Sequence, residues 1–140
     1  VIPGMIALSQ RKAAQANLDV TFQLGSMYDI PFPANQFDAV MCSFMIFHMS
    51  ETVRRKGIAE IHRVLKPQGR LLVLDMALPA QPLPRAIAKM LFGGMLEHKL
   101  QELRPLMEAS GFSNIEIASA NFRILGLSVL AFVRGSARKS

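Results

Sequence analysis

The chain has 140 residues, the size of one ordinary domain, which buries roughly two-thirds of the surface that its unfolded chain exposes. Hydrophobic residues make up 51% of it and charged residues only 19%, which excludes a disordered tail. A single cysteine, Cys42, excludes an intrachain disulfide framework and a cysteine-rich zinc ribbon. Because a lone cysteine suits a reducing compartment, we expect a cytoplasmic protein.

Lysine and arginine outnumber the acidic residues by 16 to 10, a formal net charge of +6. Such a charge favours encounters with anions but identifies no partner. The nine phenylalanines lie in apolar strings and not between arginines or glycines, so the sequence does not favour nucleic acid as a partner. The longest apolar stretch, residues 39–49, is shorter than a membrane span and is broken by Ser43 and His48, so we expect no transmembrane helix.

Short apolar runs alternate with helical windows, which indicates an α/β protein. The elements expected before the middle of the chain are a helix over residues 3–16 stopped by Asn17, strands over 20–24 and 37–43, a helix capped by Ser50 and ended by Pro67, and a strand over 70–76. The strands over 37–43 and 70–76 are continuously apolar, which predicts burial on both faces. Because a helix separates them, they predict a right-handed parallel βαβ unit.

The second half continues with a proline-rich connection over residues 77–84 and a kinked helix over 85–97, where Gly93 and Gly94 interrupt the pattern. An amphipathic helix starting near Gln101, which keeps Pro105 in its first turn, ends at Gly111. Strands over 115–118 and 128–133 complete the domain as an antiparallel edge pair, followed by a frayed tail over 136–140.

Residues 29–75 resemble the Rossmann-like, class I S-adenosylmethionine-dependent methyltransferases, particularly the quinone-biosynthesis C-methyltransferases. Four motifs in the family's order carry the resemblance: Asp-Ile-Pro-Phe-Pro at 29–33, Gln-Phe-Asp-Ala-Val at 36–40, Phe-His-Met at 47–49 and Glu-Ile-His-Arg-Val-Leu-Lys-Pro-Gln-Gly-Arg-Leu at 60–71. The resemblance implies a methyltransferase sheet, parallel with an antiparallel carboxyl-terminal edge pair, and S-adenosylmethionine as cofactor. In the motif at 60–71, Gln68 replaces the family's usual glycine.

The family's glycine-rich turn and the strand that ends in a ribose-binding acid have no counterpart here. We therefore expect residues 1–140 to form a single methyltransferase-like domain that is truncated at its N-terminus and lacks the first strand, first helix and second strand. In the family's strand order, 3-2-1-4-5-7-6, this loss leaves the strand over 20–24 without a neighbour and opens one edge of the strand over 37–43. We expect a homodimer to pair these unpaired backbone groups, either with these edges paired between chains or with residues 3–24 exchanged between chains.

The resemblance also places the candidate cofactor-binding residues, each with a structural alternative. Ser26 occupies the position of the acid that accepts the adenine amino group, and is equally an ordinary loop serine. Met5 and Met27 are candidate walls of an adenine pocket, although a methionine is more often core filler. Cys42, Ser43 and Phe44 end a buried strand, where open α/β sheets bind ligands.

His48 matches the family's recurrent histidine and is the candidate catalytic residue, as a base or as a wall of the acceptor site; packing and helix capping are its alternative. Methyl transfer needs no enzyme nucleophile, and Cys42 is better interpreted as a small buried hydrophobe. Glu60 and Arg63 are interpreted as a solvated helical pair, and Asp75 either faces the acceptor or forms a turn. No metal site is expected.

Two functions remain open. The first is methyl transfer from S-adenosylmethionine to a small, fairly apolar acceptor by a larger or assembled protein, with the isolated chain inactive. The second is a non-catalytic, methyltransferase-like module that self-associates through exposed sheet edges.

Overall fold

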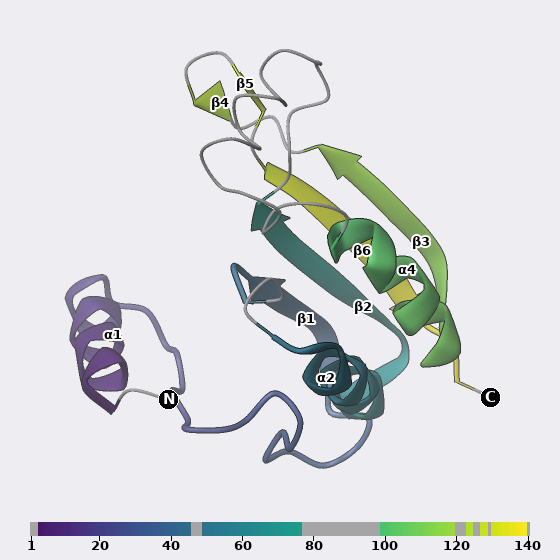
Figure 1. The fold of residues 1–140 in the computed structure, drawn as a ribbon. Helices are drawn as coiled ribbons and strands as arrows, with labels where there is room; N and C mark the ends of the chain where they lie inside the picture. Colours follow the sequence, from purple (N-terminus) through teal and green to yellow (C-terminus); the bar gives the residue numbers. More distant parts are fainter. Residues whose placement is uncertain are drawn as a thin grey trace.

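The computed structural model describes residues 3–45, 49–76, 99–119, 123–124, 127–128 and 130–139. Its centre is a four-stranded sheet in the order β1-β2-β6-β3, with a separate two-stranded ribbon, β4-β5 (Figure 1). The strands are β1 (Phe37–Ser43), β2 (Leu65–Met76), β3 (Phe112–Ser119), β4 (Arg123–Ile124), β5 (Leu127–Ser128) and β6 (Leu130–Ala137). The helices are α1 (Pro3–Gln15), α2 (Glu51–Val64) and α4 (Lys99–Ala109).

The sheet topology confirms the predicted βαβ unit and the antiparallel edge pair. β1 and β2 are parallel and joined through α2, whereas β6 runs antiparallel to both β2 and β3. β2 starts at Leu65, earlier than the predicted strand, because it follows α2 directly and bulges between Leu65 and Arg70 before regular pairing resumes. Ser50 is the N-cap residue of α2, as predicted, although its side chain makes no capping hydrogen bond.

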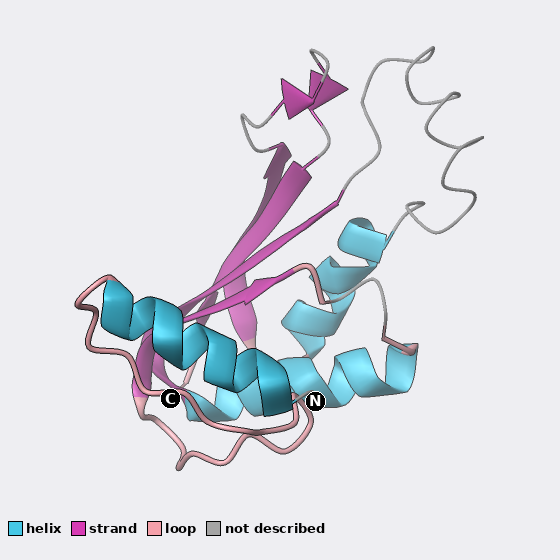
Figure 2. Cartoon of the chain, turned by 90° about the vertical axis from the view of Figure 1, so that its left-hand side faces the viewer, coloured by secondary structure: helices cyan, strands magenta, loops and turns pink. Residues whose placement is uncertain are grey.

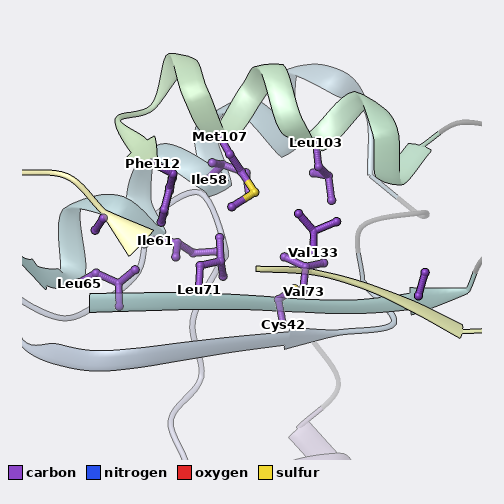
Figure 3. Packing of buried hydrophobic residues seen from close by; sticks show 12 residues of the cluster. Cys42, Ile58, Ile61, Leu65, Leu71, Val73, Leu103, Met107, Phe112 and Val133 are labelled. Atoms are coloured by element: carbon purple, nitrogen blue, oxygen red, sulfur yellow. The ribbon is translucent and has the colours of Figure 1, made fainter. Parts of the chain in front are cut away.

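The core lies between one face of this sheet and the helices α2 and α4, which Figure 2 shows on the same side. Apolar side chains from both layers meet there (Figure 3): Ile58 and Ile61 of α2, Leu103 and Met107 of α4, Leu71 and Val73 of β2, and Val133 of β6. The opposite face is open, with Met41 69% and Leu72 37% exposed. The prediction that β1 and β2 are buried on both faces is therefore wrong, because no described helix covers this second face.

The predicted strand over residues 20–24 is also wrong. These residues form no ladder, and Leu18, Val20 and Leu24 are at least half exposed. A strand needs a neighbour to pair its backbone groups, and none of the described strands lies beside this segment. The residues of this segment favour an extended conformation, but without a neighbouring described strand they form no strand.

The end of the chain is ordered by pairing, so the predicted frayed tail over 136–140 is wrong for its described residues. β6 extends to Ala137, and the backbone N–H of Arg138 donates to the carbonyl of Gly111 at 2.9 Å. The Lys139 ammonium group donates to the Asn35 amide oxygen at 2.6 Å and to the Arg63 carbonyl at 2.9 Å. Two neighbouring strands and these bonds fix a segment that composition alone suggested was loose.

α4 begins two residues before Gln101, so Pro105 lies in the helix interior and not in its first turn. Pro105 is exposed, and the carbonyl that loses its N–H donor there can be hydrated. Gly111, at φ +93°, ends this segment as predicted. The predicted connection over 77–84 and kinked helix over 85–97 lie outside the described residues, as does Ser140.

Gln68 has a left-handed backbone conformation, with φ at +61°, in the bulge of β2. Because a side chain makes this conformation unfavourable, Gln68→Gly is expected to raise the free energy of unfolding by about 1 kcal/mol. Asn114→Gly is the matched control: Asn114 has φ +53°, but asparagine tolerates this region better, so the gain should be smaller. Urea unfolding of both variants checks this, and equal gains would contradict it.

His62 gives α2 a pH-sensitive contact with the start of β3. Its ring packs edge-on against Phe112 with a centroid distance of 5.1 Å, and burial, more than the charge of Lys139, holds the pKa of His62 below 6.5. The unfolded chain therefore takes up this proton first, so stability is complete above pH 6.5 and declines below it. Thermal unfolding at pH 7.5 and 5.5 should show a smaller loss for His62→Gln than for the wild type; an equal loss would assign the pH dependence elsewhere.

Candidate functional site

The predicted site is at the carboxyl end of β1, where Cys42, Ser43 and Phe44 follow one another but face different surroundings. The Cys42 side chain is buried, whereas Ser43 and Phe44 are exposed. The N–H of Phe44 donates to the Leu74 carbonyl of β2 at 3.0 Å, and its φ of +54° is outside the strand conformation, so β1 ends before it. A left-handed conformation is uncommon for a bulky residue, and such positions often occur at functional sites.

Cys42 lies beside Asp75 of β2 on the buried face of the sheet. Burial, and then the nearby Asp75 carboxyl, raise the pKa of the Cys42 thiol to about 11. The thiol is therefore protonated at neutral pH, as expected of a small buried hydrophobe and not of a nucleophile. Asp75 itself is only 2% exposed and is paired in register with Ala131, so it belongs to the strand and forms no turn.

Ser26 and Met27 belong to the loop that leads to β1. Ser26 is half-buried, and its carbonyl accepts a hydrogen bond from the N–H of Asp29 at 3.1 Å. Met27 contacts α2 so closely that a Cβ added at Gly57 would lie 2.7 Å from its side chain. This contact and its packing against the core support the core-filler interpretation of Met27.

The loop over residues 30–32 is held by a Glu60–Arg63 clamp, which sequence analysis took for a solvated pair. Glu60 Oε2 accepts the N–H of Ile30 at 3.0 Å, while Arg63 donates to the carbonyls of Ile30 and Phe32, each at 2.9 Å. The hydrogen bond from Arg63 lowers the pKa of Glu60, and Glu60 raises that of Arg63. The spacing of three residues gave no signal of this role, because the loop partners are 30 to 33 residues away.

The structure thus brings together only part of the predicted site. Cys42, Ser43 and Phe44 share one end of β1, whereas Met5 is 63% exposed on α1, which stands apart from the sheet in Figure 1. Met27 and Cys42 are engaged in the core, Ser26 is half-buried in its loop, and Met5, Ser43 and Phe44 are exposed, so the described members of the predicted site do not share one environment. His48 lies outside the described residues, and its role stays a prediction.

A groove of about 800 Å³ lies elsewhere, on the open face of the sheet. Apolar side chains from three strands line it: Met41 of β1, Leu72 and Leu74 of β2, and Phe132 of β6. Arg70 and an ion pair between Arg134 and Glu116 contribute its charged groups. None of the predicted cofactor-binding residues lines this groove, so sequence analysis missed it. The sequence shows that β1 and β2 have apolar residues on both faces, but only the structure shows which face the described helices leave uncovered.

Two further properties concern the described residues alone. No group of three or more histidine, cysteine, aspartate or glutamate side chains there could hold a metal ion. No helix in the described ranges is long and apolar enough to cross a membrane.

Comparison with known proteins agrees with the resemblance of residues 29–75. A family model described as a methyltransferase domain matches residues 1–69. The chain is 31% identical over 131 residues to the demethylmenaquinone methyltransferase of Deinococcus radiodurans. That match covers 94% of this chain and 48% of the relative, so the chain spans about half the length of that curated protein.

Solved structures show the same fold. The S-adenosylmethionine-dependent methyltransferase SibL, solved in its apo form, superposes with a TM-score of 0.77 at 17% identity, covering 98% of this chain and 42% of SibL. Phosphoethanolamine N-methyltransferase 2 of Haemonchus contortus, solved with S-adenosyl-L-methionine, gives a TM-score of 0.67 at 16% identity, covering 96% of this chain and 41% of that one. At these identities the likeness concerns the fold and not the substrate.

Proposed function

Because the chain belongs to the class I methyltransferases, with quinone-biosynthesis C-methyltransferases among its relatives, we propose that it works in methyl transfer from S-adenosylmethionine to a small, fairly apolar acceptor. It does so as part of a larger or assembled protein, since it spans about half of the curated relative. The relative's name suggests a demethylated quinone as the kind of acceptor to try first.

The observation that carries this proposal is the sheet order. β1 and β2 are parallel, and β6 is inserted antiparallel between β2 and β3, which is the order expected of strands 4, 5, 7 and 6 in the resembled family. This order aligns the carboxyl ends of β1 and β2, and ligands of open α/β sheets bind at that edge.

S-adenosylmethionine, when bound, supplies a methyl group that its sulfonium already activates. The protein then has to align the acceptor and, where required, remove a proton. The inert Cys42 is compatible with this chemistry, which needs no protein nucleophile. Ser43 and Phe44 are proposed donor contacts, and His48 is proposed to act on the acceptor.

A chimera tests the proposal: the segment of the Deinococcus radiodurans relative that precedes the matched region is joined to this chain. With methyl-labelled S-adenosylmethionine and a short-chain demethylmenaquinone analogue, the chimera is expected to form labelled product. The 140-residue chain alone is expected to bind the donor weakly or not at all by calorimetric titration. Micromolar affinity of the chain alone would contradict the expectation that the preceding segment supplies part of the donor-binding site.

The second candidate is a non-catalytic module, and the open edge of β1 with the exposed groove beside it favours this alternative. A chimera that folds and binds donor but transfers no methyl group to any small apolar acceptor would favour the module. Its circular dichroism and the thermal shift with donor distinguish that outcome from simple misfolding.

A further inference from the structure

The segment that leads into β1 is attached to α2 by hydrogen bonds at two places. Asn35 and Gln36 donate their backbone N–H groups to carbonyls in the last turn of α2, at 3.0 and 2.8 Å. Earlier on the helix, the Glu60–Arg63 clamp holds the loop over residues 30–32. α2 therefore fixes the path of the backbone that enters the sheet.

A tight turn over residues 26–29 precedes this loop and contacts the same helix. The N–H of Asp29 donates to the Ser26 carbonyl at 3.1 Å, and the two residues form an isolated antiparallel bridge. A Cβ added at Gly57 would lie 2.7 Å from both Cγ and Cε of Met27. Because Cγ is close to the backbone, a rotation at the end of this side chain cannot relieve the contact. Glycine at position 57 thus leaves the space in which Met27 holds the turn against α2.

The turn lies toward the edge of the sheet where ligands bind. α2 connects the carboxyl end of β1 to the start of β2, so its first residues lie near the carboxyl edge and its last residues near the amino edge. The segment follows α2 in the same direction, with Met27 beside Gly57 and Asn35 beside the last turn. The turn is the part of the segment nearest the carboxyl edge, where open α/β sheets bind their ligands.

We propose that Gly57 and the Glu60–Arg63 clamp are positioning residues for the methyl donor. They hold the turn over residues 26–29 so that Ser26 meets the adenine base, and they do not touch the donor themselves. This role rests on the proposed function, in which Ser26 occupies the position of an adenine-binding residue. A turn that is already in place need not be ordered when the donor binds, so its displacement weakens donor binding.

Gly57→Ala separates positioning from stability. It leaves all hydrogen bonds of the Glu60–Arg63 clamp in place, and alanine is a better helix former than glycine, so the helix itself is not weakened. Its Cβ, however, displaces Met27 and with it the turn. Ala59→Met is the matched control, because it enlarges a side chain on the exposed surface of the same helix.

Calorimetric titration of the chimera described above measures the effect on the donor site. Its two ligands are S-adenosylhomocysteine and the deaminated analogue S-inosylhomocysteine, which lacks the adenine amino group. We expect the unsubstituted chimera and Ala59→Met to prefer the adenosyl ligand by about tenfold, the value of one hydrogen bond, and Gly57→Ala to lose most of this preference. A change that only loosened the fold would weaken both ligands alike and leave the preference unchanged.

Two variants at Glu60 test the contribution of the clamp. Glu60→Ala removes the acceptor of the Ile30 N–H and is expected to reduce the preference for the adenosyl ligand. Glu60→Gln keeps an oxygen that can accept this N–H and should retain more of the preference. Equal losses in the two variants would overturn the role of the clamp.

Ser26→Ala shows whether Gly57 acts through the turn. Alone it should abolish the preference, and Gly57→Ala added to it should cause no further loss, because both act on the same contact. Additive losses, or an unchanged preference in either single variant, would overturn the inference and leave the proposed function intact. An unsubstituted chimera that binds neither ligand would instead overturn the proposed function and the positioning role with it.

Discussion

Lys139→Met is expected to lower the free energy of unfolding by about 2 kcal/mol. The Lys139 ammonium group joins three acceptors from distant parts of the chain: the Asn35 amide oxygen and the carbonyls of Arg63 and Leu65. Those carbonyls end α2, where a positive charge is favourable. Burial, together with the charge of Arg63, lowers the pKa of Lys139, so the group is partly desolvated. Methionine keeps the apolar stem but leaves these carbonyls without their charged donor.

Arg138→Met is the matched control. It removes the same charge from the adjacent residue, but the Arg138 side chain is exposed and its backbone N–H still donates to Gly111. The expected loss is below about 0.5 kcal/mol. Urea unfolding followed by circular dichroism measures both variants, and equal losses would show that net charge, not the three hydrogen bonds, stabilises the end of the chain.

The elements that sequence analysis predicted correctly are those whose evidence is local. Continuous apolar residues over 37–43 and helical spacing over 50–66 identify β1 and α2, and their alternation implies the parallel βαβ unit. Gly111 at φ +93° likewise ends its segment as its residue type predicts. These features depend on residues close together in sequence, so the pattern contains what decides them.

The wrong predictions concern features that depend on residues far apart in the sequence. Residues 20–24 have the composition of a strand but no described neighbour. Composition assigns Lys139 to a tail, whereas its side chain bonds to Asn35, 104 residues away. The apolar outer face of β1 likewise predicts burial, which depends on a covering layer. At the site, the terminal position of Cys42 in β1 was predictable, whereas the contact of Met27 with α2 required the folded loop.

The spacing of Glu60 and Arg63 on α2 does not show whether the pair is solvated or bound to the loop over residues 30–32. Breaking this pair is the second change for which we expect a large effect on stability. Arg63→Met is expected to lower the free energy of unfolding clearly more than a matched exposed variant does, because the guanidinium group donates to the carbonyls of Ile30 and Phe32 as well as to Glu60. All of these bonds are partly buried. The loop carbonyls therefore lose their donors, and the Glu60 carboxylate loses its charged partner.

Arg55→Met provides the comparison, since Arg55 pairs with Glu51 on the same helix at 2.9 Å but both side chains are about two-thirds exposed. Exposed pairs of this kind contribute little, so its loss should stay below about 0.5 kcal/mol. Hydrogen exchange adds a local measurement: the amide of Ile30, which donates to Glu60, should lose protection in Arg63→Met and keep it in Arg55→Met. Equal losses of stability and of amide protection in the two variants would show that Glu60 and Arg63 form the solvated pair that their spacing suggests.

The same variant has a pH dependence with a defined sign. The hydrogen bond from Arg63 holds the pKa of Glu60 below its ordinary 4.5, so the folded chain keeps this carboxylate charged after the unfolded chain has been protonated. The stabilisation is therefore complete above pH 4.5 and is lost as the pH falls through the lower value of the folded state. The difference in stability between the wild type and Arg63→Met should shrink over that interval, whereas a difference independent of pH would mean that the carbonyls of Ile30 and Phe32, and not Glu60, account for the whole effect of Arg63.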